Sequence, residues 1–269
     1  MLAQLILQCL EVNEFGEQRC KLLHCFCIIS DISFVRRVFA AFIYATENSE
    51  QLLQFTSFAS TVALHFPSAM LEGLKELVKR PNIYISMFND RRQRFQTFYN
   101  IMTLLKWAKE TAENSGIQTS MFGLRYDQFV DTISIAELGG LLIRFGVSSL
   151  AVFLESLETM NEESYDKFTI AIEFIEEIDG AAPMEPGMSF TISNYLSVVY
   201  VHCLRLIKID DNPRYGTVAV LKLNKLVKHI LSQKWAFSKN RFVSTFVKEV
   251  LMSSTELFGI GLDLTELEN

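Results

Sequence analysis

The chain has 269 residues, of which 49% are hydrophobic, and it contains 22 phenylalanines but only 12 glycines and 5 prolines. This composition excludes a largely disordered protein and is typical of a well-packed globular chain with one large core or two moderate ones. The formal net charge of −6 excludes a uniformly basic nucleic-acid coat, but it is compatible with a basic groove on an acidic body, because charges act mainly within a Debye length of about 10 Å.

Apolar residues recur with the period of an α-helix along nearly the whole chain, and the alternation typical of β-strands is scarce. The predicted fold class is therefore all-α. The predicted helices are, in chain order, 2–12, 17–29, 32–46, 49–64, 68–79, 90–113, 126–144, 147–159, 162–178, 190–208, 216–234 and 238–256. Stretches rich in glycine, proline, serine and asparagine separate them, and Gly146 is expected to end the helix over 126–144.

Two of the separating stretches predict the domain organisation. DGAAPMEPG (179–187) holds two prolines and two glycines, and IDDNPRYG (209–216) has turn-forming residues at nearly every position. We therefore expect a larger N-terminal helical lobe, residues 1–188, and a smaller C-terminal helical lobe, residues 189–269. The helix over 190–208 would connect them.

Cysteine usage and the apolar runs indicate the cellular environment. Five cysteines is an odd number, and three of them crowd one apolar segment, which is typical of a reduced, intracellular protein. The start, MLAQLILQCLEV, has no basic region ahead of its apolar residues, so no signal peptide is expected. The longest apolar runs fall short of the about 20 residues that cross a membrane. The sequence predicts a soluble cytosolic or nuclear protein without a membrane partner.

Motifs of catalysis and cofactor binding are missing from the sequence. It has no GxGxxG after a strand, no Walker loop, no GxSxG and no HExxH. We therefore expect no enzyme and no cofactor.

Two clusters of potential metal ligands have a simpler interpretation. Cys20, His24, Cys25 and Cys27 have a spacing that fits no standard zinc pattern, and buried free cysteines are common in apolar helices. The acidic cluster Glu173, Glu176, Glu177 and Asp179 spreads around a helix and is expected to be a solvated face. No metal site is predicted.

Positive charge collects first at the start of the helix over 90–113. Arg91, Arg92 and Arg94 fall in its first turn, where the helix dipole is already positive. An anion there would be held by free backbone N–H groups and by planar guanidinium groups that suit phosphate. Lys106 and Lys109 add charge farther along. The alternative is that these cations pair with surface acids.

A second basic helix is predicted in TVAVLKLNKLVKHILSQKW (217–235). Lys222, Lys225, His229 and Gln233 share one side, with Lys228 at its edge, and Leu223, Leu226, Val227 and Ile230 share the other side. A solvated face is the default interpretation of the lysines. A face that follows a phosphate backbone is the alternative, and it would need only non-specific contacts.

The order of several short motifs between about 127 and 200 resembles a known family. An acidic residue and two glycines (Glu137, Gly139 and Gly140) come first, then RFGV (144–147), then Gly-Ala-Ala-Pro (180–183), then Phe190 with Tyr195 five residues on. In this order and spacing the chain is similar to the nucleoproteins of non-segmented negative-strand RNA viruses, of the paramyxovirus and pneumovirus type. The chain is shorter than the core of that family and has Leu196 in place of a proline.

The resemblance implies a two-lobed helical fold with an RNA groove between the lobes. It implies encapsidation of single-stranded RNA independently of sequence, through phosphate and sugar contacts, and assembly into homo-oligomeric rings or filaments. A viral polymerase cofactor is a further implied partner, and the implied location is the virion and the host cytoplasm, with the nucleus left open. The implied RNA-binding residues are Arg91, Arg92, Arg94, Lys106, Lys109, Arg144, Tyr195, Lys222, Lys225 and Lys228.

An all-α scaffold for protein–protein interaction is the alternative function. In that case the chain would bind the helix of a partner protein, and its basic residues would only be solvated.

Overall fold

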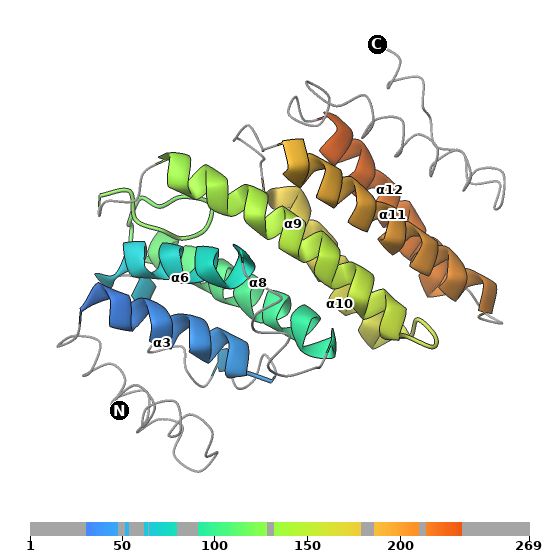
Figure 1. Cartoon of the computed structure of the whole chain (residues 1–269), viewed down its shortest axis with the longest axis horizontal. Coiled ribbons are helices and arrows are strands. Elements are labelled where there is room, and N and C mark those ends of the chain that lie inside the picture. The colour runs from blue at the N-terminus through green and yellow to red at the C-terminus, as the bar shows by residue number, and fades with distance from the viewer. Residues whose placement is uncertain are drawn as a thin grey trace. The chain divides into compact units, whose positions relative to one another are not determined.

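A computed structural model of the chain describes residues 31–47, 52–53, 62–63, 65–79, 91–127, 132–178, 186–209 and 214–232. Within these ranges it contains seven α-helices and no strand, which confirms the all-α fold class. The helices are α3 (Ile32–Ala45), α6 (Pro67–Lys79), α8 (Arg91–Asn114), α9 (Thr132–Ser156), α10 (Glu162–Glu177), α11 (Pro186–Ile209) and α12 (Arg214–Ser232) (Figure 1). The helices predicted over 2–12, 17–29, 49–64 and 238–256 lie wholly or mostly outside the described residues.

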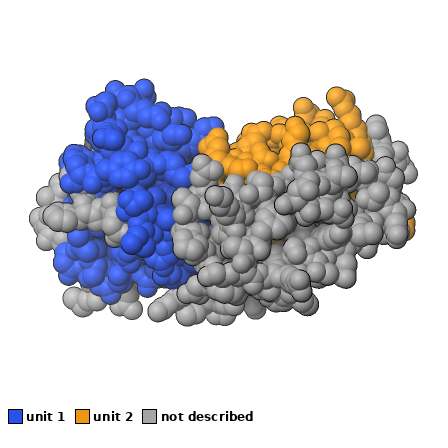
Figure 2. Space-filling view, turned by 90° about the horizontal axis from the view of Figure 1, so that it is seen from above, with its two compact units in different colours: residues 1–145 blue, residues 146–269 orange. Residues whose placement is uncertain are grey.

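The chain forms two compact units, residues 1–145 and residues 146–269 (Figure 2). The predicted domain boundary between residues 188 and 189 stays a prediction.

α9 runs without interruption from Thr132 to Ser156, so the expectation that Gly146 ends a helix was wrong. Glycine costs a helix interior only about 1 kcal/mol relative to alanine. Apolar residues that α9 buries on both sides of Gly146, such as Leu142 and Leu150, contribute more than that.

α9 is also longer and more apolar than the sequence analysis allowed for. Its length and composition would let it cross a membrane, although 78% of its most apolar stretch is buried inside the protein. Such burial is typical of a helix in the core of a globular domain, whose apolar residues face other side chains rather than lipid.

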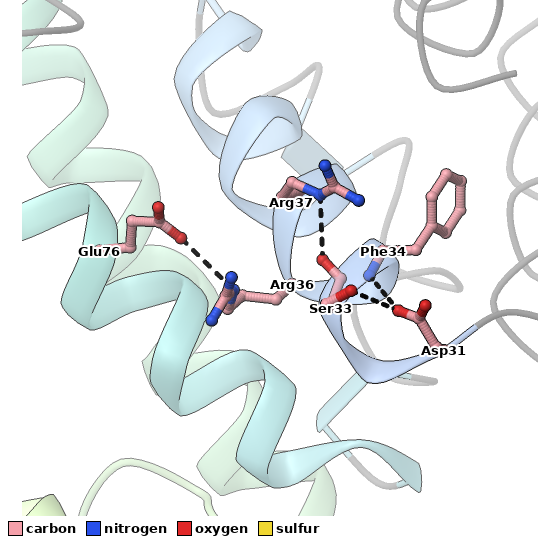
Figure 3. A network of polar contacts seen from close by, with 6 residues as sticks. All are labelled: Asp31, Ser33, Phe34, Arg36, Arg37 and Glu76. Carbon is pink, nitrogen blue, oxygen red and sulfur yellow. Dashed lines mark hydrogen bonds and ion pairs between the residues drawn. The ribbon is translucent and has the colours of Figure 1, made fainter. Parts of the chain in front are cut away.

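The start of α3 is fixed by a capping residue. The Asp31 carboxylate accepts hydrogen bonds from the Ser33 hydroxyl at 2.5 Å and from the backbone N–H of Phe34 at 2.8 Å (Figure 3). The bond from Phe34 satisfies a backbone donor that the first turn of a helix leaves unpaired. The two bonds also hold the pKa of Asp31 below its usual value. One turn later, Arg36 Nε lies 3.4 Å from Glu76 Oε2 of α6, and this ion pair joins the two helices (Figure 3).

Close packing in the first unit joins α3 to α6 and α8. A Cβ atom on Gly73 of α6 would lie 3.1 Å from the backbone oxygen of Arg36 and 3.2 Å from the Phe39 ring, so a residue without a side chain lets α6 approach α3 closely. From α8, the amide of Asn100 donates hydrogen bonds to the backbone oxygens of Ile43 at 3.2 Å and of Thr46 at 2.8 Å. Backbone carbonyl groups at the end of α3 thereby gain hydrogen-bond partners from a side chain of another helix.

A tight loop after α8 folds back onto that helix. Gly116 has a left-handed φ of 66°, and the N–H of Ile117 donates to the Ala112 oxygen at 3.0 Å, which is the pattern of a glycine C-cap. The loop then turns at Gly123, with φ 70°, and the Ser120 N–H donates to the Leu124 oxygen at 2.8 Å. Phe122 and Leu124 are thereby buried in the core.

In the second unit, α12 packs against both α10 and α11. The Tyr200 hydroxyl of α11 donates to Asn224 Oδ1 of α12 at 2.9 Å, and Gly216 of α12 lies against Ile207. Moving backward along α11 therefore means moving forward along α12, so these two helices are antiparallel. Figure 1 shows them side by side.

The contacts between α10 and α12 run in the opposite sense. The rings of Tyr165 and Tyr215 have their centroids 5.4 Å apart, and about two turns farther along both helices Lys222 Nζ lies 2.6 Å from Glu173 Oε1. α10 and α12 are therefore parallel. The start of α10 is capped by Asn161, whose side-chain oxygen accepts from the Ser164 N–H at 2.9 Å.

The carbonyl groups at the end of α9 are bound by an arginine of α11. Arg205 Nη2 donates to the backbone oxygens of Leu154 at 2.9 Å and of Leu157 at 2.8 Å. The Leu154 oxygen also accepts from the Leu157 N–H at 3.3 Å. The last turn of a helix leaves carbonyl groups without their usual partner four residues on, and the C-terminal end of a helix dipole favours a cation.

We expect Arg205→Met to lower the free energy of unfolding by about 2 kcal/mol, because two charge-assisted hydrogen bonds to carbonyl groups are lost while the aliphatic packing is kept. Urea denaturation followed by circular dichroism measures the change. Lys208→Met is the matched control, because this substitution removes the same charge from the same turn of α11 at an exposed position. It should change the free energy of unfolding by less than about 0.5 kcal/mol. Equal effects of the two substitutions would contradict the role given to Arg205.

Candidate interaction surface

Two of the predicted RNA-binding arginines in the first unit make contacts within the protein. The Arg94 guanidinium carbon lies 5.5 Å from the centroid of the Phe145 ring, a cation–π geometry, and Phe145 in turn meets Phe98 edge to face at 6.1 Å. Arg144 Nη2 lies 3.3 Å from the backbone oxygen of Val78 at the end of α6. The aromatic and the arginine of RFGV thus contribute to helix packing in this unit.

The other predicted basic residues of the first unit lie along α8. Arg91 and Arg92 are in its first turn, as predicted, and their side chains lie outside the described residues. Lys106 is exposed and Lys109 is half-buried. Their assignment to a binding surface stays a prediction.

The acidic residue ahead of the two adjacent glycines of α9 belongs to an ion-pair network with α6. Glu137 Oε2 lies 2.7 Å from Lys75 Nζ, whose side chain is only 7% exposed, and Glu137 Oε1 lies 2.5 Å from Lys79 Nζ. Hydrogen bonds from Lys75 and then Lys79 lower the pKa of Glu137 from its ordinary value. The buried lysine is thereby paired, as a buried charge requires.

In the second unit the predicted division of the basic helix is confirmed for the residues of α12 whose side chains the structure describes. Leu223, Leu226 and Val227 of α12 are buried, whereas Lys225 is exposed and Lys222 is half-buried. Lys222 forms its ion pair with Glu173 of α10. Lys228 lies in α12 with a side chain outside the described residues. Tyr195 is half-buried on α11, and its role in binding stays a prediction.

The potential metal ligands and nucleophiles take ordinary structural places where the structure describes them. Cys20, His24, Cys25 and Cys27 lie outside the described residues, as does Asp179 of the acidic cluster. Glu173 of that cluster is bound to Lys222, and no three potential ligands converge on one point within the described ranges. Complete burial raises the pKa of the Cys203 thiol to about 12, so this thiol stays protonated and is a poor nucleophile.

Five exposed aliphatic side chains on the α11–α12 pair were not predicted from the sequence, and one of them, Ile209, is the last residue of α11. Val198 and Val201 of α11 are 41% and 57% exposed, and Val218 and Leu221 of α12 are 39% and 50% exposed. Val218 and Leu221 precede Lys225 by seven and four residues, which places all three on one side of α12. That spacing was present in the sequence, and it shows that the lysine side of this helix is apolar as well as basic.

Charge on α11 and α12 has a single sign. Neither helix contains an aspartate or a glutamate, although the whole chain carries a net charge of −6. The basic residues of the two helices are Arg205, Lys208, Arg214, Lys222, Lys225 and Lys228. The exposed aliphatic side chains therefore share these two helices with basic residues only, whereas the neighbouring α10 is acidic and pairs Glu173 with Lys222.

Comparison with protein families gives a match over nearly the whole chain. The family model described as Integrator complex subunit 5 C-terminus matches residues 2–268. No significant match was found among curated proteins or among solved structures.

The resemblance to viral nucleoproteins was wrong, because the matching family describes a subunit of a cellular complex. Three conclusions drawn from it are wrong for the same reason: the encapsidating function, the partners (single-stranded RNA, other copies of the chain and a polymerase cofactor) and the location in the virion and host cytoplasm. The predicted RNA groove rested on the resemblance alone and is not retained.

The motifs that carried the resemblance were short, and the two that lie in α9 have a structural explanation. Glu137, ahead of the two adjacent glycines, is paired with Lys75 and Lys79 of α6. RFGV lies within α9, with its arginine bonded to α6 and its phenylalanine under Arg94.

Proposed function

This chain belongs to the Integrator complex subunit 5 C-terminus family, and we propose that it is an all-α scaffold that associates with other subunits of the Integrator complex in the nucleus. The proposal is the protein-interaction alternative from the sequence analysis, and the family match supports it better than it supports RNA encapsidation. The proposal gives the chain no catalytic role.

The observation that carries the proposal, beside the family match, is the group of exposed aliphatic side chains on α11 and α12. Single exposed aliphatic residues are normal on a protein surface, but several on neighbouring helices mark an interaction site. Burial of such side chains against a partner supplies the main favourable free energy of protein association.

The proposal is tested by affinity purification of the tagged full-length protein from nuclear extract treated with nuclease. Quantitative mass spectrometry would compare the purified proteins with those retained by the tag alone. We expect other Integrator subunits to be enriched after nuclease treatment, because contacts between proteins do not depend on nucleic acid. Enrichment of no Integrator subunit, or enrichment that nuclease abolishes, would refute the proposal.

A further inference from the structure

We infer that the outer side of the α11–α12 pair binds an acidic amphipathic helix of another Integrator subunit. We call this side the α11–α12 face and define it by Val198, Val201 and Lys208 of α11 and by Val218, Leu221 and Lys225 of α12. The inference rests on the proposed function, since the partner is a subunit of the same complex, and it adds the surface and the chemistry of the partner segment.

Register within the pair brings the aliphatic residues to one level. Tyr200 bonds to Asn224, and Ile207 lies against Gly216. In this antiparallel pair Val201 therefore lies level with Leu221 to within about two residues. Both side chains are at least half exposed, which directs them to the outer side rather than into the core formed by Leu223, Val199 and Cys203. Val198 and Val218 extend the apolar area from this centre in the two directions along the helices.

Basic residues flank this apolar centre. Lys225 lies one turn beyond Leu221 and is exposed, and Lys208 lies two turns beyond Val201 and is exposed. No acidic residue of α11 or α12 neutralises them, whereas the half-buried Lys222 is already paired with Glu173. An apolar centre with a charged rim is the usual anatomy of a protein–protein interface.

This arrangement favours a protein partner over a nucleic acid. A phosphate backbone gains nothing from four aliphatic side chains, whereas an amphipathic helix can bury apolar residues at i, i+3, i+4 and i+7 against them. A helix laid on two packed helices also follows ordinary helix packing. Acidic residues beside the apolar stripe of the partner would complement Lys208 and Lys225 and set its orientation.

The first experiment repeats the nuclease-treated purification with variants of the full-length protein. We expect Lys208→Glu with Lys225→Glu, and separately Val201→Ser with Leu221→Ser, to reduce recovery of at least one Integrator subunit by about tenfold or more. Circular dichroism should show that both variants stay folded, because the substituted residues are exposed. Lys208 lies in the last turn of α11, so its replacement by glutamate should lower the free energy of unfolding by no more than about 1 kcal/mol. Lys106→Glu on α8, an exposed lysine of the first unit, is the matched control and should leave recovery unchanged.

Failure of this inference is distinguishable from failure of the proposed function. If the unaltered protein recovers Integrator subunits and both double variants recover them equally well, the α11–α12 face is not the docking site and the scaffold proposal stands. If the unaltered protein recovers none, the scaffold proposal itself is refuted.

A second experiment identifies the segment that covers the face. Carbodiimide couples lysine amines directly to carboxylates, so treatment of the purified complex should join Lys208 or Lys225 to aspartate or glutamate of another subunit, within a segment whose apolar residues have helical spacing. Coupling only to the chain's own acidic residues, such as those in TELEN (265–269), would overturn the inference in favour of an internal contact. If both lysines are instead protected from coupling, and this protection disappears on nuclease treatment, the inference would be overturned in favour of a nucleic acid.

Discussion

Replacing Gly123 by alanine is expected to lower the free energy of unfolding by about 3 kcal/mol or more, which is a large part of the stability of a typical domain. A Cβ atom at this position would lie 2.5 Å from the backbone nitrogen of Lys109 and 2.6 Å from the carbonyl carbon of Ala108. Both atoms belong to the backbone of α8, which cannot move aside as a flexible side chain could. The φ of 70° adds a conformational cost of about 1 kcal/mol for any L-residue with a side chain.

Gly116→Ala provides a matched control for this prediction. Gly116 has nearly the same φ, 66°, but a Cβ atom there would meet no atom within 4 Å. Only the conformational cost of about 1 kcal/mol should then appear. Urea denaturation of both variants separates the two contributions. If the two variants lose similar amounts of unfolding free energy, the loop does not approach α8 as closely as described.

Replacing Asn100 by aspartate is expected to cost about 3 kcal/mol at neutral pH, although the two side chains have the same shape. Asn100 is fully buried, and its amide nitrogen donates to the backbone oxygens of Ile43 and Thr46. An ionised carboxylate would place an acceptor against two acceptors in a fully buried site, and both the lost bonds and the buried charge are costly. Asn114→Asp, at the exposed end of the same helix, should cost less than about 1 kcal/mol.

The loss of unfolding free energy caused by Asn100→Asp should depend on pH. Burial and the two facing carbonyl groups would raise the pKa of the new carboxyl above the value of about 3.9 that it has in an unfolded chain. A folded state that binds the proton more tightly than the unfolded state loses stability as pH rises above that value. The difference in unfolding free energy between the variant and the original protein should therefore be larger at pH 7.5 than at pH 5. A difference that does not change with pH would contradict the buried position of Asn100.

Hydrophobic periodicity predicted the described helices well because most of them bury one face. The predicted helix over 32–46 corresponds to α3, that over 162–178 to α10, and that over 216–234 to α12, each to within a few residues. In these helices buried residues such as Val35, Phe168 and Leu223 recur every three or four positions. The predicted end of the helix over 90–113 is also confirmed, since α8 ends at Asn114 and Gly116 takes the left-handed conformation typical of a helix end.

The prediction failed where a glycine had two possible roles. Gly146 was expected to end a helix, but it lies inside α9. A single sequence shows that a glycine can turn the chain, but not whether burial of the surrounding residues makes a continuous helix more stable. In α9 the residues on both sides of Gly146 are almost all buried, and this burial depends on contacts between segments far apart in the sequence.

The sequence located basic residues but could not show what each of them binds. Arg144 was assigned to RNA, yet it bonds to the backbone oxygen of Val78, 66 residues earlier in the chain. Arg205 was assigned no role, yet it binds two carbonyl groups at the end of α9. Arginine can satisfy a carbonyl as well as a phosphate, so only tertiary structure distinguishes the two uses. The lysines of α12 were placed on the correct side, but the exposed Val218 and Leu221 beside them were overlooked.

The most direct test of the account is the size and composition of the particle that carries this protein in nuclear extract. After nuclease treatment and size-exclusion chromatography with light scattering, we expect the protein to elute far above the 30.8 kDa of the chain, with other Integrator subunits at a constant ratio across the peak. Elution at the mass of the chain alone, or in fractions separate from those subunits, would contradict the account.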